Sequence, residues 1–233
     1  MNAIITGASK GIGKAIATLL IQNGCNLAIC ARNEQDLLDT KNELQAINPE
    51  ACILAIACDM SQKEDVLRFA NSILETYASI DILVNNAGRF LPGDISNEAD
   101  GLLETLIETN LYSAYHLTRA LLPSMMNNKQ GHIFNISSIA ALKAYPQGGS
   151  YSISKYALEG FSKNLREEMK PYNIKVTTVN PGATMSDSWK GSGIDEDRIM
   201  KAEDIAAVVW SVYNLSPQAV VEEIVLRPQL GDL

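Results

Sequence analysis

Short apolar runs alternate with amphipathic stretches along the whole chain. The apolar runs have the length of buried strands, and they fall at residues 3–5, 26–30, 52–58, 81–86, 132–137, 174–180 and 222–226. The stretches between them have helical spacing, and they fall at residues 13–24, 34–47, 61–78, 99–126, 151–169 and 202–214. Strands and helices in this alternation predict parallel strands joined by helical crossovers. Because the runs are continuously apolar, we expect helices on both faces of the sheet.

This pattern predicts an α/β fold with a doubly wound, Rossmann-type parallel sheet. The chain has 233 residues, of which 46% are hydrophobic, enough for one large core but too few for two. No internal repeat or low-complexity tract interrupts the alternation, so residues 1–233 are expected to form a single domain. Ligands of such a sheet bind beyond the carboxyl ends of its strands.

The charge balance gives no reason to expect a polyanionic partner. The formal net charge is -8, from 27 acidic and 19 basic side chains, which is unlike a surface for nucleic acid or an anionic membrane. The first strand begins almost directly after Met1, and no apolar run approaches the ~18 residues of a membrane span. We therefore expect a cytoplasmic protein without nucleic-acid or membrane partners.

The cysteines and histidines do not have the spacing of a metal site. The four cysteines lie in or beside predicted strands without a CxxC pair, and the chain has two histidines, His116 and His132. One histidine falls in a helical stretch and the other opens a strand, so both are expected to be structural. We predict no metal and reduced, partly buried thiols.

A glycine-rich loop, TGASKGIG at residues 6–13, follows the first strand and opens the first helix. Glycine at these places allows a tight turn and close approach of the backbone to a pyrophosphate, which the helix N-terminus would hold. A nucleoside-triphosphate P-loop is disfavoured, because Ala8 and Ala15 replace its first glycine and its magnesium-binding hydroxyl. The alternative is a plain turn between strand and helix. The cofactor-binding residues predicted here are Gly7, Ser9, Lys10, Gly11, Ile12 and Gly13.

The end of the second strand indicates which dinucleotide binds. An acidic residue there would bind the ribose hydroxyls of NAD, but the sequence has Ala31 and Arg32, and Lys10 lies in the glycine loop nearby. Two cations facing a 2′-phosphate indicate NADP rather than NAD, by about tenfold or more for one charge-assisted bond. Two solvated surface cations are the alternative.

Polar residues follow the third and fourth strands. Asp59 can accept a hydrogen bond from an adenine amino group, although it could instead cap the helix that begins near Ser61. After the fourth strand comes NNAG at residues 85–88, in which Asn85 would tie neighbouring strands together. The small residues after it let the backbone approach a ligand, and a polar turn is the alternative. The predicted cofactor contacts of this motif are Asn86, Ala87 and Gly88.

Tyr151 and Lys155 are four residues apart in the string YSISK, within a predicted helix. They share one helix face, so the ammonium is expected to favour the phenolate and to bring a proton donor with an ordinary pKa of about 10 toward neutral pH. A serine-hydrolase site is excluded, because GGSYS around Ser150 lacks the closing glycine of GxSxG and neither histidine has an evident carboxylate partner.

The order of the glycine loop, NNAG, Asn110, NISSIA, YSISK and NPG resembles the short-chain dehydrogenase/reductase family over nearly the whole chain. The resemblance implies a catalytic tetrad of Asn110, Ser138, Tyr151 and Lys155. Ser138, with Ser137 as its competitor, would stabilise developing negative charge on the substrate oxygen. Lys155 would also bind the nicotinamide ribose, and Asn110 would hold a water that links Lys155 to solvent.

The resemblance further implies that Pro181 and Gly182 begin the loop on the nicotinamide side. This loop departs from many relatives, so either Thr184 or Ser186 is expected to meet the carboxamide. Residues 183–200, which include Gly191, Gly193 and Trp189, are predicted to form a short substrate lid. The end of the chain, residues 225–233, resembles the sepiapterin reductase-like and small bacterial carbonyl reductase branches.

We therefore expect an NADP(H)-dependent oxidoreductase that interconverts a ketone or aldehyde and an alcohol, with 3-oxoacyl or 3-hydroxy acid substrates first. A polyol, sugar or pteridine-type carbonyl reductase is the alternative within the same class. A catalytically idle NADP-binding regulator is the alternative of another class, disfavoured by the intact tetrad. The resemblance also implies a homodimer or homotetramer, formed through the long helices after the fourth and fifth strands.

Overall fold

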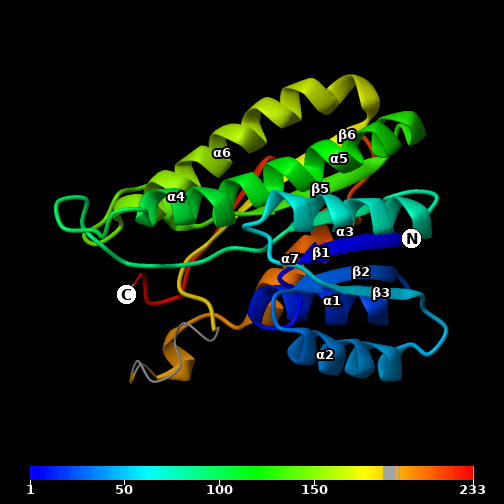
Figure 1. Ribbon diagram of the computed structural model, residues 1–233, viewed down its shortest axis with the longest axis horizontal. Coiled ribbons are helices and arrows are strands. Elements are labelled where there is room, and N and C mark those ends of the chain that lie inside the picture. Colours follow the sequence, from blue (N-terminus) through cyan, green and yellow to red (C-terminus); the bar gives the residue numbers. More distant parts are fainter. Residues whose placement is uncertain (186–192, 194, 233) are drawn as a thin grey trace.

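The computed structural model describes residues 1–185, 193 and 195–232 of the chain (Figure 1). Its strands form one sheet in the order β3-β2-β1-β4-β5-β6-β7, and every neighbouring pair is parallel. The strands are β1 Asn2–Thr6, β2 Asn26–Ala31, β3 Ile53–Ala57, β4 Ile82–Asn85, β5 Gly131–Ile136, β6 Ile174–Pro181 and β7 Glu223–Leu226. The doubly wound, Rossmann-type sheet expected from the sequence is confirmed.

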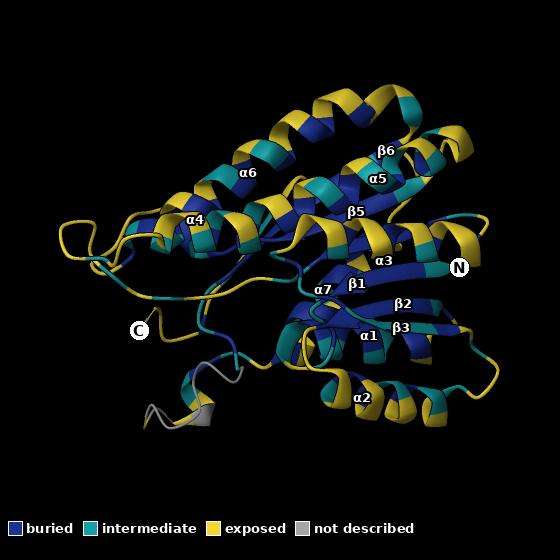
Figure 2. Cartoon of the chain, viewed as in Figure 1, coloured by how far each residue is buried: buried dark blue, intermediate teal, exposed yellow. Residues whose placement is uncertain are grey.

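Helices cover both faces of this sheet, as Figure 1 shows. One face carries α1 (Gly11–Gln22), α2 (Glu34–Ile47) and α7 (Ala202–Tyr213). The other carries α3 (Lys63–Thr76), α4 (Leu102–Ile107), α5 (Ser113–Asn128) and α6 (Gly149–Met169). In Figure 2 the central strands are buried almost throughout, whereas the helices alternate between buried and exposed residues. The continuous apolar runs therefore correspond to strands buried on both faces.

The helix predicted at residues 99–126 is interrupted. Helix α4 ends at Ile107, a π-helical turn spans Glu108–Tyr112, and α5 continues from Ser113. The π turn contains Asn110, which is buried, and its side chain bonds to residues outside the helix. Such widened turns commonly occur where a helix presents a side chain to a functional site. The sequence pattern could not reveal it, because the spacing of apolar residues stays close to helical.

Where the strand order reverses, β1 lies between β2 and β4. Connections leave this point on opposite faces of the sheet, which opens a crevice at the carboxyl ends of the strands. Asn85 closes β4 and donates to Oδ1 of Asn135 on β5 at 2.8 Å, so it ties neighbouring strands together as expected. Among the described residues, no helix has the length and apolarity needed to cross a membrane.

Candidate active site

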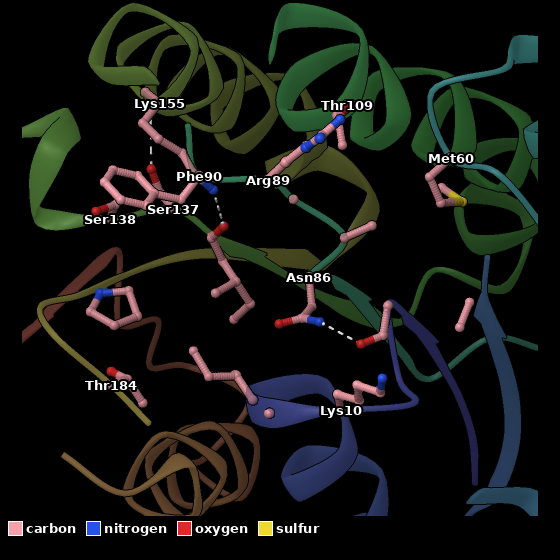
Figure 3. A pocket seen from close by; sticks show the side chains of 18 of the residues that line it. Lys10, Met60, Asn86, Arg89, Phe90, Thr109, Ser137, Ser138, Lys155 and Thr184 are labelled. Atoms are coloured by element: carbon pink, nitrogen blue, oxygen red, sulfur yellow. Dashed lines mark hydrogen bonds between the residues drawn. The ribbon is translucent and has the colours of Figure 1, made fainter. Parts of the chain in front are cut away.

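A cavity of about 690 Å³ opens at the carboxyl ends of the strands (Figure 3). Ser138 and Lys155 lie on one side of it, and Met60 and Lys10 lie on another. The structure gathers most of the predicted site residues around this cavity, namely Gly7, Ser9, Lys10, Gly11, Ile12, Arg32, Asp59, Asn86, Ala87, Gly88, Ser138, Tyr151, Lys155, Pro181, Gly182 and Thr184. Gly13 and Asn110 lie behind its wall, and Ser186 lies outside the described residues.

The glycine loop is held in shape by Asn86. Its side-chain amide donates to the carbonyl oxygens of Thr6 at 2.9 Å and Gly7 at 3.1 Å, and the second of these bonds is drawn in Figure 3. Gly7 has a φ of +65°, and a Cβ on Gly13 would lie 2.3 Å from the Gly7 carbonyl oxygen. Glycine is therefore required at both positions, because a side chain would open the turn. Asn86 shapes the loop in addition to facing the cavity.

The N-terminus of α1 is prepared for an anion. Lys10 precedes the helix without a side-chain cap bond, and the first turn contains no acidic residue. The helix therefore begins with backbone N–H groups and the positive end of its dipole directed at the cavity. This arrangement fits the pyrophosphate of a dinucleotide.

The two cations expected at the 2′-phosphate differ in their surroundings. Lys10 Nζ lies 2.8 Å from Oδ2 of Asp36 on α2, and both side chains are partly exposed. Arg32 follows β2 and lines the cavity. Asp36 therefore competes with a phosphate for Lys10, a contact that the sequence pattern did not reveal.

Asp59 is shared between the cavity and the chain around it. Its Oδ1 accepts from the backbone N–H of Ser61 at 3.0 Å and from the Ser61 hydroxyl at 2.9 Å. Helix α3 begins only at Lys63, so Asp59 closes the turn before the helix instead of capping the helix itself. Asp59 still lines the cavity, beside Cys58 and Met60.

Ser138 lies against the Tyr151 hydroxyl. A hydrogen bond from Ser138 lowers the pKa of Tyr151, but burial of the phenol outweighs it and raises that pKa to about 12. Ser138 lies just after β5, and its Oγ also accepts from the N–H of Ala140 at 3.1 Å. Ser137 also lines the cavity, but its hydroxyl donates to the Lys155 carbonyl oxygen at 3.4 Å.

Lys155 lies one helical turn after Tyr151 on α6, and its Nζ is 5.9 Å from the Tyr151 ring centroid. Nζ donates to the Ile136 carbonyl oxygen at 3.1 Å, a bond drawn in Figure 3. Burial lowers the pKa of Lys155 to about 8, because the ammonium is shielded from water. The expectation that Lys155 brings the pKa of Tyr151 toward neutral pH is therefore not met, because desolvation dominates both groups.

Asn110 joins the loop after β4 to the catalytic helix α6. Its Oδ1 accepts from the Arg89 N–H at 2.7 Å, and its Nδ2 donates to the Arg89 carbonyl at 3.0 Å and to Ser154 Oγ at 2.9 Å. Ser154 Oγ in turn donates to the Tyr151 carbonyl oxygen at 2.7 Å. Both amide hydrogens are thus used, so the side chain positions the loop after β4 against the catalytic helix. Its predicted role in holding a water stays a prediction.

Several residues of the cavity wall were missed by the sequence analysis. Arg89 and Phe90 directly follow the NNAG motif, and Thr109 directly precedes Asn110. Figure 3 shows the Arg89 side chain extending toward Thr109, away from Ser138. Adjacency to a recognised motif was the available signal, because the residue after a strand-end turn tends to face the same crevice.

On the side of Pro181 and Gly182, Thr184 lines the cavity and its hydroxyl donates to the Gly182 carbonyl at 2.9 Å. The two ends of the predicted lid are paired, because the Met185 N–H donates to the Met200 carbonyl at 2.8 Å. Gly191 and Trp189 lie outside the described residues, and the lid stays a prediction.

Known proteins resemble this chain in sequence and in fold. A family model for short chain dehydrogenases matches residues 1–197. Sepiapterin reductase of Chlorobaculum tepidum is 37% identical over 239 residues, which cover 99% of this chain and 97% of the relative. A metagenomic short-chain oxidoreductase solved with NADP has a TM-score of 0.84 and 32% identity, over 98% of this chain and 97% of that chain. L-sorbose reductase of Gluconobacter frateurii, solved with NADPH and L-sorbose, has a TM-score of 0.90 and 27% identity. The match covers 97% of this chain and 95% of that chain.

The strand order and the crevice at its reversal define a Rossmann-type α/β protein. Within that class, the chain belongs to the short-chain dehydrogenase family. It is accordingly an oxidoreductase, as the resemblance of its motifs implied.

Proposed function

We propose that this protein is an NADP(H)-dependent oxidoreductase that interconverts a ketone or aldehyde and the corresponding alcohol. One observation carries the proposal: Tyr151, which lies beside Ser138 and one helical turn from Lys155, shares a cavity with the glycine loop at the N-terminus of α1. A proton donor and an anion-binding helix end in one crevice are what carbonyl reduction with a dinucleotide requires.

NADP(H) is favoured over NAD(H) by the end of β2. Arg32 lines the cavity where an acidic residue would bind the ribose hydroxyls of NAD, and Lys10 lies close by. The structures with NADP and NADPH named above support the same choice. The cofactor supplies the hydride when it is bound.

The chain's own residues handle the proton and the developing charge. Ser138 and Tyr151 would together hold the carbonyl oxygen of the substrate, and Tyr151 would donate its proton as negative charge develops there. Lys155, buried and bonded to Ile136, holds a positive charge beneath the phenol below a pH of about 8. That charge stabilises the phenolate left after transfer. Asn110 holds the loop after β4 in place against the catalytic helix.

The names of the relatives supply substrates to test. One is a sepiapterin reductase and another an L-sorbose reductase, so a pteridine and a ketose join the 3-oxoacyl compounds expected from the sequence. We propose that residues 183–200 act as the substrate lid of a single domain.

The test is oxidation of NADPH and NADH with a panel of these carbonyl compounds. Tyr151→Phe should lower kcat by more than tenfold, about 1.4 kcal/mol or more, while the Kd for NADPH stays within about twofold, because the hydroxyl handles only the proton.

Arg32→Asp should reverse or abolish the preference for NADPH. Asp36→Asn should tighten NADPH binding several-fold, because it removes a carboxylate that pairs with Lys10.

Equal kcat/KM for NADPH and NADH in the wild type would contradict the cofactor assignment. Retention of more than about a tenth of the activity by Tyr151→Phe would require another acid. An idle NADP-binding regulator would bind NADPH tightly and reduce none of the carbonyl compounds.

A further inference from the structure

The end of the cavity at Tyr151 and Ser138 is bordered by an aromatic ring that takes no part in the proposed proton transfer. Phe90 packs edge-on against Tyr151, with ring centroids 4.9 Å apart and planes at 83°. Phe90 lines the cavity and nevertheless keeps 44% of its surface exposed. An apolar ring that remains exposed in a cavity leaves a ring face for another molecule.

A second ring, Tyr145, lies in the loop before α6. It is 41% exposed and does not itself line the cavity. A Cβ on Gly148 would lie 3.2 Å from Cε1 of the Tyr145 ring, so this ring lies close to the start of the catalytic helix.

The two loops that carry these rings are joined to each other. The Gly93 N–H donates to the Gln147 carbonyl at 3.0 Å, and the Gln147 N–H donates to Asp94 Oδ1 at 2.9 Å. The loop after β4 and the loop before α6 therefore form one continuous border at the Tyr151 end of the cavity. A border fixed by its own hydrogen bonds presents the Phe90 ring before any substrate arrives, which lowers the entropic cost of binding.

We propose that Phe90 forms an aromatic wall of the substrate site, which selects carbonyl compounds whose carbonyl carbon carries a planar ring. The inference rests on the proposed function, because it places the carbonyl oxygen at Tyr151 and Ser138. With the oxygen there, a substituent on the carbonyl carbon extends into the space next to the Phe90 ring, which already contacts Tyr151. Offset or edge-to-face contact with a planar substituent is worth more than contact with a saturated ring of equal size.

Acetophenone and cyclohexyl methyl ketone test this proposal, since each has a methyl ketone on a six-membered ring and only one ring is planar. We define the discrimination as kcat/KM for acetophenone divided by kcat/KM for cyclohexyl methyl ketone, with NADPH as reductant. Comparing this ratio between variants cancels the intrinsic reactivity of the two ketones. Phe90→Leu should lower it by about three- to tenfold, chiefly through KM for acetophenone.

Two further variants distinguish an effect on substrate preference from a general effect on the structure of the loop. Phe90→Tyr keeps the ring face and should leave the ratio within about twofold. Ile95→Ala changes a 74% exposed apolar residue of the same loop that does not line the cavity, and should leave the ratio unchanged. An equal fall in kcat for both ketones in Phe90→Leu would assign Phe90 to supporting Tyr151 and would overturn the proposal.

A binding measurement keeps the inference distinct from the proposed function. The Tyr151→Phe variant saturated with NADPH should bind acetophenone more tightly than cyclohexyl methyl ketone in ligand-observed NMR, and Phe90→Leu in that background should remove the difference. Such binding without turnover by the wild type would refute the proposed function alone. The inference would be overturned if the ketones were reduced or bound but Phe90→Leu left the preference for acetophenone unchanged. It would also be overturned if neither ketone were bound.

Discussion

Burial moves the pKa values of Tyr151 and Lys155 in opposite directions, although the two residues lie on one helix face. The pKa of the phenol is raised to about 12 and the pKa of the ammonium is lowered to about 8, because exclusion of water disfavours the charged form of each group. The spacing of the two residues is visible in the sequence, but their degree of burial is not. At the residue scale, the cavity therefore keeps the tyrosine protonated and ready to donate.

Lys155 should reduce the stability of the fold at neutral pH. Its folded pKa lies below its ordinary value of 10.5, so the cost of the buried ammonium is fully present below about pH 8 and is relieved as pH rises toward 10.5. Lys155→Met should therefore raise the free energy of unfolding by about 1 to 2 kcal/mol at pH 6.5, and by less at pH 10. Urea denaturation at both values measures this.

Lys163→Met is the matched control for this experiment. Lys163 lies on the same helix, its side chain is 53% exposed, and it pairs with Glu223 at 3.0 Å. It should give no gain in stability at pH 6.5. A gain from Lys155→Met that is the same at both pH values would mean that packing, not charge, limits the stability at this position.

The catalytic helix α6 depends on a carboxylate from a distant loop. Oε1 of Glu98 accepts from the backbone N–H of Ser150 at 2.8 Å, and Oε2 contacts the Ser150 hydroxyl. Gly149 has a φ of +26°, and a Cβ there would collide with Glu98, so the close approach requires glycine. A carboxylate at this end satisfies a free N–H group and complements the helix dipole. At the scale of elements, the loop after β4 thus fixes the start of the helix that carries Tyr151.

Glu98→Ala should lower the free energy of unfolding by about 1 to 2 kcal/mol, as loss of a helix cap does. It should also lower kcat, since Tyr151 lies one residue beyond Ser150. Glu98→Gln should retain part of the stability and part of kcat, because the amide oxygen can still accept from the Ser150 N–H. Urea denaturation and steady-state kinetics measure these effects, with Glu75→Ala, an exposed change on α3, as control. Unchanged stability in Glu98→Ala would show that solvent satisfies the helix end equally well.

On the scale of the whole molecule, α5 and α6 present an apolar groove to the outside. The groove has a volume of about 590 Å³, and its wall includes Tyr112, Tyr115 and Phe161. Tyr112 is 48% exposed and Tyr115 is 36% exposed, which is unusual for neighbouring aromatic residues on a helix. The same two helices were expected to form a homodimer or homotetramer, and the groove supports that proposal.

Tyr115→Glu should reduce the molar mass of the protein in solution, because it replaces an apolar ring of the groove by a charge that association of two copies would have to remove from water. Light scattering after size-exclusion chromatography measures the mass. Leu38→Glu is the control, since Leu38 is 48% exposed on α2, on the opposite face of the sheet. A wild-type protein that is monomeric at micromolar concentration would contradict the proposed assembly.

The sequence by itself determined the local structure and the type of site. Runs of apolar residues specify strands and helices through periodicity, so the boundaries of most elements agree to within a few residues. Glycine and tyrosine-lysine spacings are likewise local, so Gly7, Gly11, Tyr151 and Lys155 were found directly. Local geometry also placed Ser138 at the end of a strand.

The tertiary structure decided what depends on residues far apart in the chain. The strand order, the π turn at Asn110, the competition of Asp36 for Lys10 and the presence of Phe90 in the cavity all arise from contacts across the fold. The same holds for the pKa of Tyr151, because desolvation is set by everything that packs around the phenol. Periodicity and spacing describe neighbours along the chain, whereas charge, burial and specificity depend on neighbours in space.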